Sequence, residues 1–256
     1  MHAILTYHAI DDTGSPISCH PDAFERHLDW LRSGPVRAAT IEELAALPAS
    51  ADAVAITFDD ALVNFGDVAA PRLLDRGLPS TVFVVADCAG GTNDWGGRLA
   101  RGVPRLPALG WPALARLQEQ GIAIGSHTRT HPDLTMLDAR ALEDEIRGSA
   151  DVIARETGRR PAAFAYPYGR VDARVATAAG SVYRVACTTE LRAFGATEDL
   201  VRLPRLDAYY FQKAGTLEAW GSPAFHRFIT RRARLRRLRE AGRAAWRSAG
   251  TRQVPS

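Results

Sequence analysis

Cysteine and long apolar runs are scarce in this chain of 256 residues, and each scarcity excludes a class of protein. The three cysteines, Cys19, Cys88 and Cys187, form no CxxC pair, so we expect neither a disulfide framework nor a thiolate zinc site. No apolar run approaches the ~18 residues that a membrane-spanning helix needs. The first residues lack the pattern of a secretory signal, so we expect a reducing, cytoplasmic location.

Short β-like runs alternate with helical patterns along the chain, which indicates an α/β fold. We expect strands at residues 3–7, 53–58, 80–85, 122–126, 162–166, 183–187 and 200–206, and helices at 22–32, 69–76, 112–120 and 141–157. Glycines that follow the helices favour parallel strands. No Gly-rich phosphate turn follows the first strand. The pattern therefore favours a barrel-like parallel sheet of about seven strands over an open doubly wound sheet, with function on the loops at the C-terminal strand ends.

The charges are unevenly distributed. Residues 225–256 contain ten arginines and one glutamate, whereas residues 1–224 contain 22 basic and 28 acidic residues. We therefore expect a barrel over residues 1–224 and a basic C-terminal helix within 225–256. Apolar residues of this helix recur near one face of a 3.6-residue period: Phe225, Phe228, Ile229, Leu235, Leu238, Ala245 and Trp246. Contact with an anionic membrane and packing on the barrel both remain open, and no nucleic-acid partner is expected.

Two clusters of metal-binding residue types follow predicted strands. Asp59 and Asp60 end the apolar run 53–58, and His127 and His131 follow the run 122–124. Two histidines four residues apart can converge on one ion. Together with Asp60 they would form a two-histidine, one-carboxylate site with open positions, as a catalytic metal requires. A turn or helix cap is the alternative role of the Asp59–Asp60 pair.

Further polar groups occur at other strand ends. The run 164–166 stops at Pro167-Tyr168-Gly169, where a backbone amide near Tyr168 could face a developing oxyanion and an aromatic ring could border a sugar. This motif is otherwise an ordinary turn. His8 ends the first strand, and Arg202 and Arg205 belong to the last one.

These motifs resemble those of the polysaccharide deacetylases of carbohydrate esterase family 4. Residues 57–60 are similar to that family's first motif, residues 127–131 to its second and residues 166–169 to its third, in the same order. The resemblance extends over residues 3–208. It implies a distorted parallel (β/α) barrel. It also implies a divalent metal ion held by Asp60, His127 and His131, with Asp59 as the general base and the amide of Tyr168 in the oxyanion hole.

The chain departs from the family pattern at two places. The third motif usually carries an arginine that supports the base, but Ala165 occupies that position here, and we expect Arg202 or Arg205 to orient Asp59 instead. The late motif usually supplies a histidine as general acid, and residues 200–210 contain none. His8 is our candidate for an active-site role. We expect Tyr166, Pro167 and Arg205 to contact the substrate.

The resemblance implies a metal-dependent N-deacetylase that hydrolyses the acetamide of an N-acetylated amino sugar. We expect its substrate to be a cytoplasmic or lipid-linked intermediate of glycan biosynthesis, met in the cytoplasm or at the inner face of the membrane. Zinc is the default metal, and cobalt, nickel and iron suit the same ligands. An O-acetyl esterase, a non-sugar amidase and a silent glycan-binding barrel are the alternatives.

Overall fold

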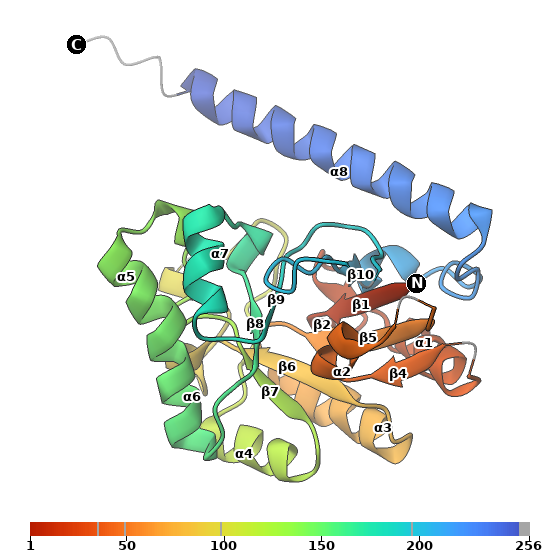
Figure 1. Cartoon of the computed structure of the whole chain (residues 1–256), viewed down its shortest axis with the longest axis horizontal. Helices are drawn as coiled ribbons and strands as arrows, with labels where there is room; N and C mark the ends of the chain where they lie inside the picture. Colours follow the sequence, from red (N-terminus) through yellow and green to blue (C-terminus); the bar gives the residue numbers. More distant parts are fainter. Residues whose placement is uncertain (35, 49, 98, 196, 251–256) are drawn as a thin grey trace.

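A curled sheet of parallel strands forms the centre of the protein (Figure 1). The computed structural model describes residues 1–34, 36–48, 50–97, 99–195 and 197–250, with side chains described as far as Leu238. The strand order is β10-β1-β5-β6-β7-β8-β9, and β4 pairs with β5. The strands are β1 (His2–Tyr7), β4 (Arg37–Ala39), β5 (Ala53–Phe58), β6 (Ser80–Val84), β7 (Ala123–Ser126), β8 (Ala163–Ala165), β9 (Val185–Cys187) and β10 (Leu206–Asp207). The expected distorted parallel barrel is confirmed.

Helices surround this sheet (Figure 1). The α-helices of the barrel are α1 (Pro21–Arg32), α2 (Ile41–Ala46), α3 (Ala70–Asp75), α4 (Trp111–Glu119), α5 (Ala139–Glu143), α6 (Ser149–Thr157) and α7 (Ala173–Gly180). The shorter helical segments are η1 (Phe65–Ala69), η2 (Ala86–Cys88), η3 (Trp95–Gly97), η4 (Leu134–Met136), η5 (Asp144–Gly148), η6 (Pro167–Gly169) and η7 (Ala208–Phe211). The four predicted helices correspond to α1, η1 with α3, α4, and α5 through α6. The sequence patterns missed α2 and α7.

The last predicted strand is the main error in the fold prediction. Residues 200–206 do not form a continuous strand, because Pro204 lacks the N–H that a ladder needs. The first part of the segment lies beside β9, where the amide of Leu203 donates to the carbonyl of Ala186. Only its last part, in β10, pairs with β1. The break places Arg205 between these two pairings.

Small and apolar side chains fill the interior of the barrel. One core cluster contains side chains from β1, β5, β6, β8 and β9: Ile4, Ala53, Ala55, Phe83, Ala163, Ala165, Val185 and Cys187. Alternate residues of the same strands pack outward against the helices, as the two-residue period of a strand requires. The alternation determines which residues at each strand end point toward the barrel axis.

The basic C-terminal segment forms the helix α8 (Pro223–Gly250), which crosses one end of the barrel (Figure 1). Phe225 and Ile229 are buried in the main core cluster, so the start of the tail is part of the barrel. Leu235 and Leu238 are 39% and 70% exposed and point elsewhere, so the apolar residues do not share one face as predicted. The side chains of Ala245 and Trp246 lie outside the described residues, as do residues 251–256. No helix in the described part of the chain is long and apolar enough to span a membrane.

Candidate active site

Three strands direct a polar residue into the same end of the barrel. In β5, the inward series Ala53, Ala55 and Thr57 continues to Asp59. The same alternation carries the inward series of β1 to His8 and that of β7 to His127. Because these strands are parallel, their C-terminal ends meet at one rim, which explains why residues far apart in the sequence converge.

Backbone strain is concentrated at this rim. Five non-glycine residues in the described part of the chain have a positive φ, namely Asp60, Ala61, Thr128, His131 and Tyr168. All belong to, or adjoin, the three sequence motifs. Such conformations cost of order 1–3 kcal/mol each and persist where the surrounding structure enforces them. At Asp60, with φ of 71°, the turn brings a second carboxylate to the rim immediately after Asp59.

Asp60, His127 and His131 form a compact group of potential metal ligands. The Nε2 atoms of the two histidines are 3.2 Å apart. Asp60 Oδ1 lies 3.8 Å from Nε2 of His127 and 3.9 Å from Nε2 of His131. All three residues are buried, and one ligand atom from each lies within 4.8 Å of the others. The three ligands predicted from the sequence therefore converge in the structure.

The hydrogen bonds of this group fit a bound cation. His127 Nδ1 lies 2.7 Å from the carbonyl of Ala165, so it donates there and leaves the Nε2 lone pair toward Asp60 and His131. Asp60 Oδ1 is buried and has no hydrogen-bond partner among the described residues. A buried carboxylate oxygen without a partner is costly, and a metal ion would satisfy it. Two imidazoles and a carboxylate suit several divalent ions, so the residues present fit a metal without identifying it.

The electrostatics of the group agree with this interpretation. Burial raises the pKa of Asp60, opposed by attraction to His8 and His127. Burial lowers the pKa of His131 far below its ordinary value, and the neighbouring His127 lowers it further. A neutral imidazole is the form that binds metals. A divalent cation would reverse the penalty on an ionised Asp60, because it would be the largest charge in the site.

Asp59 is held by a buried arginine. Nη1 and Nη2 of Arg205 each donate to one oxygen of the Asp59 carboxylate at 2.7 Å, and Arg205 Nε donates to the carbonyl of Thr188. Burial alone acts to raise the pKa of Asp59, but attraction to Arg205 and His127 outweighs it and holds the pKa well below its usual range. Asp59 is therefore ionised at neutral pH and fixed in orientation by two parallel hydrogen bonds.

Arg205 makes the contact with Asp59 that the family resemblance led us to expect from an arginine at position 165. Arg205 and Ala165 both lie in the interior of the barrel, where the guanidinium carbon of Arg205 is 5.9 Å from the centre of the Phe83 ring. Of the two arginines proposed from the sequence, Arg205 makes the contact, while Arg202 lies near Asp199 with a half-exposed side chain. Because Arg205 is buried and committed to Asp59, the structure does not place its side chain at an accessible surface for substrate.

His8 also lies near the Asp59 carboxylate. Its Nε2 atom is 3.8 Å from Asp59 Oδ2, and about a quarter of its side chain is exposed. The expected position of His8 at the rim thus agrees with the structure. The His8 imidazole is therefore close to Asp59 without being one of the three potential metal ligands.

Tyr168 borders the opening of the site. Its side chain is 54% exposed, and its ring lies 4.8 Å from that of His131. Tyr168 is the second residue of η6. Pro167 before it has no N–H, the amide of Gly169 after it donates to the carbonyl of Tyr166, and no side chain caps the segment. The adjacent Gly169 has φ of 68° and packs so closely on Thr189 that a Cβ atom would lie 2.1 Å from its Oγ1. This contact fixes the loop that presents the Tyr168 amide.

Tyr166 and Pro167 do not face this opening with accessible side chains. Tyr166 continues the outward series of β8 after Phe164, and its ring is fully buried. Its hydroxyl donates to the carbonyl of Val201 at 2.8 Å. Pro167 is also buried. The strand alternation that directs Ala165 inward therefore directs Tyr166 into the layer of helices.

Glu145 is a site residue that the motif search did not find. Its carboxylate, on the π-helical segment η5, accepts hydrogen bonds from the amides of Arg129 and Thr130 and from the hydroxyl of Thr130. These contacts hold the loop between the two histidines. The helical pattern around Glu145 gave no sign of this role.

Trp95, on the long loop after β6, stacks on His131 with a centroid separation of 5.0 Å.

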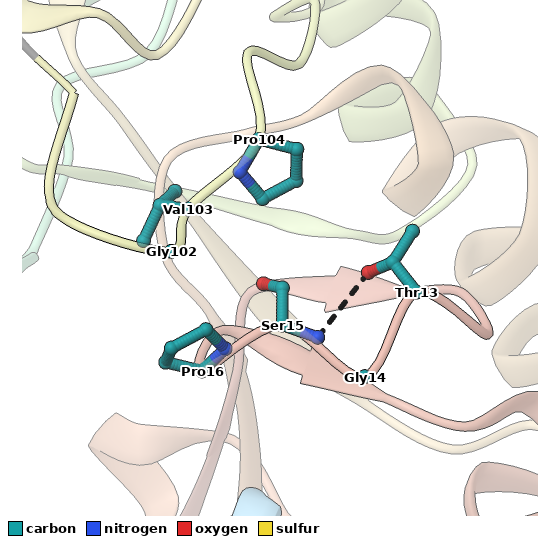
Figure 2. Close-up of a pocket in the computed structure, with 7 residues that line it drawn as sticks. All are labelled: Thr13, Gly14, Ser15, Pro16, Gly102, Val103 and Pro104. Carbon is teal, nitrogen blue, oxygen red and sulfur yellow. Dashed lines mark hydrogen bonds between the residues drawn. The ribbon is translucent and has the colours of Figure 1, made fainter.

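An open groove of about 570 Å³ lies between two loops at this end of the barrel (Figure 2). One loop joins β2 (Ala9–Ile10) to β3 (Ser18–Cys19), and the other follows β6 and carries Trp95. The groove is lined by small and apolar residues: Thr13, Gly14, Ser15, Pro16, Gly102, Val103 and Pro104. The second loop also supplies Trp95, which stacks on His131, and His8 lies directly before β2, the strand that leads into the first loop.

The fold and the site together define a parallel barrel hydrolase with a possible Asp-His-His metal centre. A model of the family described as polysaccharide deacetylase matches residues 46–183, which is more than half of the chain. The chain therefore belongs to the polysaccharide deacetylase family, whose members are hydrolytic deacetylases that cleave amide C–N bonds.

Similar proteins agree with this assignment. YxkH of Bacillus subtilis strain 168, named as a polysaccharide deacetylase, is 25% identical over 79% of this chain and 70% of its own length. The deacetylase PplD of Streptococcus pyogenes, solved in complex with acetate, superposes with a TM-score of 0.68 at 25% identity, over 80% of this chain and 91% of its own. A polysaccharide deacetylase from Bacillus cereus gives a TM-score of 0.67 at 26% identity, over 81% and 64% of the two chains.

Proposed function

We propose that this protein hydrolyses the acetamide of an N-acetylated amino sugar within an intermediate of glycan biosynthesis, releasing acetate and a free amine. The observation that carries the proposal is the ionised Asp59, fixed by Arg205 directly beside the Asp60–His127–His131 group. A site that only bound glycan would have little use for a base held next to metal ligands. The three free cysteines support a reducing, cytoplasmic setting.

Each residue has a proposed part in the reaction. Asp60, His127 and His131 would hold a divalent ion, zinc by default, which supplies Lewis acidity toward the acetyl carbonyl and toward water. Asp59 removes the proton from the attacking water. The Tyr168 amide donates to the oxygen that develops negative charge, and the Tyr168 ring borders the sugar. His8 donates a proton to the leaving amine nitrogen.

The groove of Figure 2 supports an extended substrate. Its volume of about 570 Å³ lies within the range of small-molecule sites, and its loops flank the rim on which the catalytic groups converge. We place neighbouring units of the glycan there. The exposed Tyr168 ring would then contact the unit that carries the reacting acetamide.

Acetate release tests the proposal directly. The zinc-loaded protein would be given N-acetylated sugars, including nucleotide-linked and lipid-linked forms, beside matched O-acetylated compounds, with Asp59→Asn as the control. We expect acetate and amine in equal amounts from one of the N-acetylated compounds, and none with the variant. Acetate from the O-acetylated compounds alone would replace the amidase by an esterase. Release from neither series, with metal bound, would contradict the proposed activity.

A further inference from the structure

Helix α8 has an inner face that packs on the barrel. Phe225 and Ile229 are buried, and the Phe225 ring lies 5.9 Å from that of Phe211 and 5.3 Å from that of Trp220. One turn further, the guanidinium carbon of Arg232 is 5.5 Å from the centre of the Tyr210 ring. These contacts fix the rotation of the helix about its axis. They therefore also determine which residues of α8 lie on the face that points away from the barrel.

The same helix contacts the segment that follows β9. Arg236 Nη2 donates to Thr189 Oγ1 at 2.9 Å, and the Thr189 hydroxyl donates to the carbonyl of Tyr168 at 3.3 Å. Arg237 is 3.0 Å from the carboxylate of Glu190. Because Thr189 and Glu190 follow β9, α8 lies at the C-terminal end of that strand, beside the loop that presents the Tyr168 amide.

The outer face of α8 combines arginine with exposed leucine. At 100° per residue, Arg227, Arg231, Arg234, Leu235 and Leu238 fall on the side opposite Phe225 and Ile229. The three arginines are exposed, and Leu235 and Leu238 are among the few large apolar side chains exposed in the described part of the chain. We call these five residues the outer face.

The arginines of this face are not paired with carboxylates in the described part of the chain. Residues 223–238 contain six arginines and no acidic residue. Among the residues that the structure describes, no carboxylate lies within 4.0 Å of Arg227, Arg231 or Arg234. Arginines attract an anionic surface, and exposed leucines can insert into its interface; these are the two contributions that hold interfacial helices on a membrane. Each basic residue near an anionic surface contributes about 1 kcal/mol of attraction.

We propose that the outer face of α8 binds the surface of an anionic lipid bilayer. The catalytic rim is then held about one helix diameter, roughly 10 Å, from that surface. It follows that the substrate is a glycan carried on the membrane, a consequence that rests on the proposed deacetylase function. The bilayer binding itself is a separate property, because none of the five residues belongs to the catalytic groups.

Vesicle co-sedimentation of the full chain tests the binding. The probes are vesicles of phosphatidylcholine alone and of phosphatidylcholine mixed equally with phosphatidylglycerol. We expect binding to the mixed vesicles only, weakened by salt. Arg227→Gln/Arg231→Gln/Arg234→Gln should reduce the partition coefficient on the order of a hundredfold. Leu235→Ser/Leu238→Ser should also weaken it. A deletion of the tail would be a poor test, because Phe225 and Ile229 are part of the core.

A charge-matched variant serves as the control. Arg116, Arg159 and Arg184 are exposed, lie near the opposite end of the strands and pair with no carboxylate within 4.0 Å among the described residues. Replacement of these three by glutamine should leave vesicle binding unchanged. If both triple variants lost vesicle binding equally, net charge alone would explain the binding, and the proposal would be overturned. Unchanged vesicle binding of the outer-face variant would overturn it too. Binding to a DNA or RNA duplex that ignores the leucine changes would assign the face to nucleic acid instead.

A second comparison separates this inference from the proposed function. An N-acetylated glycan would be presented on a lipid in mixed vesicles and, separately, free in solution. We expect faster deacetylation on vesicles, and the outer-face variant should lose only that advantage. Equal rates on both forms for the wild type would overturn the membrane-borne substrate. Vesicle binding without acetate from either form would contradict the deacetylase function and leave the bilayer contact standing.

Discussion

Arg205 and Ala165 show how one requirement of the site is met from a different position in the chain. The family resemblance leads one to expect an arginine at position 165, whereas here the arginine reaches Asp59 from the segment before β10. The inward alanine and the break at Pro204 leave room for this approach. From the sequence, the residue that orients Asp59 could be limited to Arg202 or Arg205. The choice depended on a break in strand pairing that local patterns did not reveal.

Replacement of Arg205 should damage both stability and activity. Arg205→Met leaves a buried carboxylate without a partner, which typically costs about 3–5 kcal/mol of unfolding free energy. Asp59 would also lose the two hydrogen bonds that fix its orientation, so acetate release should fall as well. Arg202→Met is the matched control, because the surface pair with Asp199 contributes less than about 1 kcal/mol. Denaturant unfolding and acetate release measure both effects, and equal behaviour of the two variants would contradict the assigned roles.

His8 should matter for turnover and not for metal content. If it protonates the leaving amine, His8→Ala lowers kcat on the order of 10²–10⁴. Its Nε2 is 3.8 Å from Asp59 and is outside the metal-ligand group, so bound metal should stay near the wild-type level. The exposed His226 offers a control, because its replacement by alanine removes an imidazole elsewhere. A wild-type kcat for His8→Ala would remove His8 from the mechanism.

At the scale of elements, the alternation of the strands explains both the success and the error of the sequence prediction. Asp59, His127 and His8 continue inward series and meet at the rim. Tyr166 continues an outward series, so its ring packs among the helices. The two-residue period could have excluded Tyr166 as a substrate contact. Glu145 could not have been found this way, because its role depends on how η5 packs against a distant loop.

Gly125 provides a test of the packed interior. A Cβ atom at this position of β7 would lie 2.4 Å and 2.5 Å from atoms of the Phe83 ring and 3.2 Å from the carbonyl of Ala163. Gly125→Ala should therefore cost about 1–3 kcal/mol of unfolding free energy, and Phe83→Leu should recover part of that loss. Gly195→Ala is the control, since its Cβ would meet nothing within 4 Å. An additive double variant would show that the two side chains do not compete for space.

At the scale of the whole molecule, the parallel barrel and the convergence of Asp60, His127 and His131 were predictable, because short buried runs and polar strand ends are local signals. The contacts of the tail were not. A helical period assigns apolar residues to a face, but it does not distinguish those that cover a core from those that remain exposed. Phe225 and Ile229 are in the core, while Leu238 is on the surface.

Metal binding should stabilise the folded chain as a whole. An ion that binds only the native state at a hundred times its Kd adds about 2.7 kcal/mol to the unfolding free energy. For a chain of this size the Tm should rise by roughly 5–10 °C, since each kcal/mol shifts Tm by about 2–4 °C. His131→Ala should abolish the rise, measured by thermal unfolding with zinc and with a chelator. The same shift in that variant would place the ion elsewhere.

The central claim is that adjacent aspartates divide the work, with Asp60 holding the metal and Asp59 acting as the base. The most direct measurement is bound metal per chain in Asp59→Asn and in Asp60→Asn, taken beside acetate release from the best substrate. We predict that both variants lose acetate release, that Asp59→Asn keeps the wild-type metal content and that Asp60→Asn loses it. Equal metal content in the two variants, or wild-type acetate release by Asp59→Asn, would contradict the account.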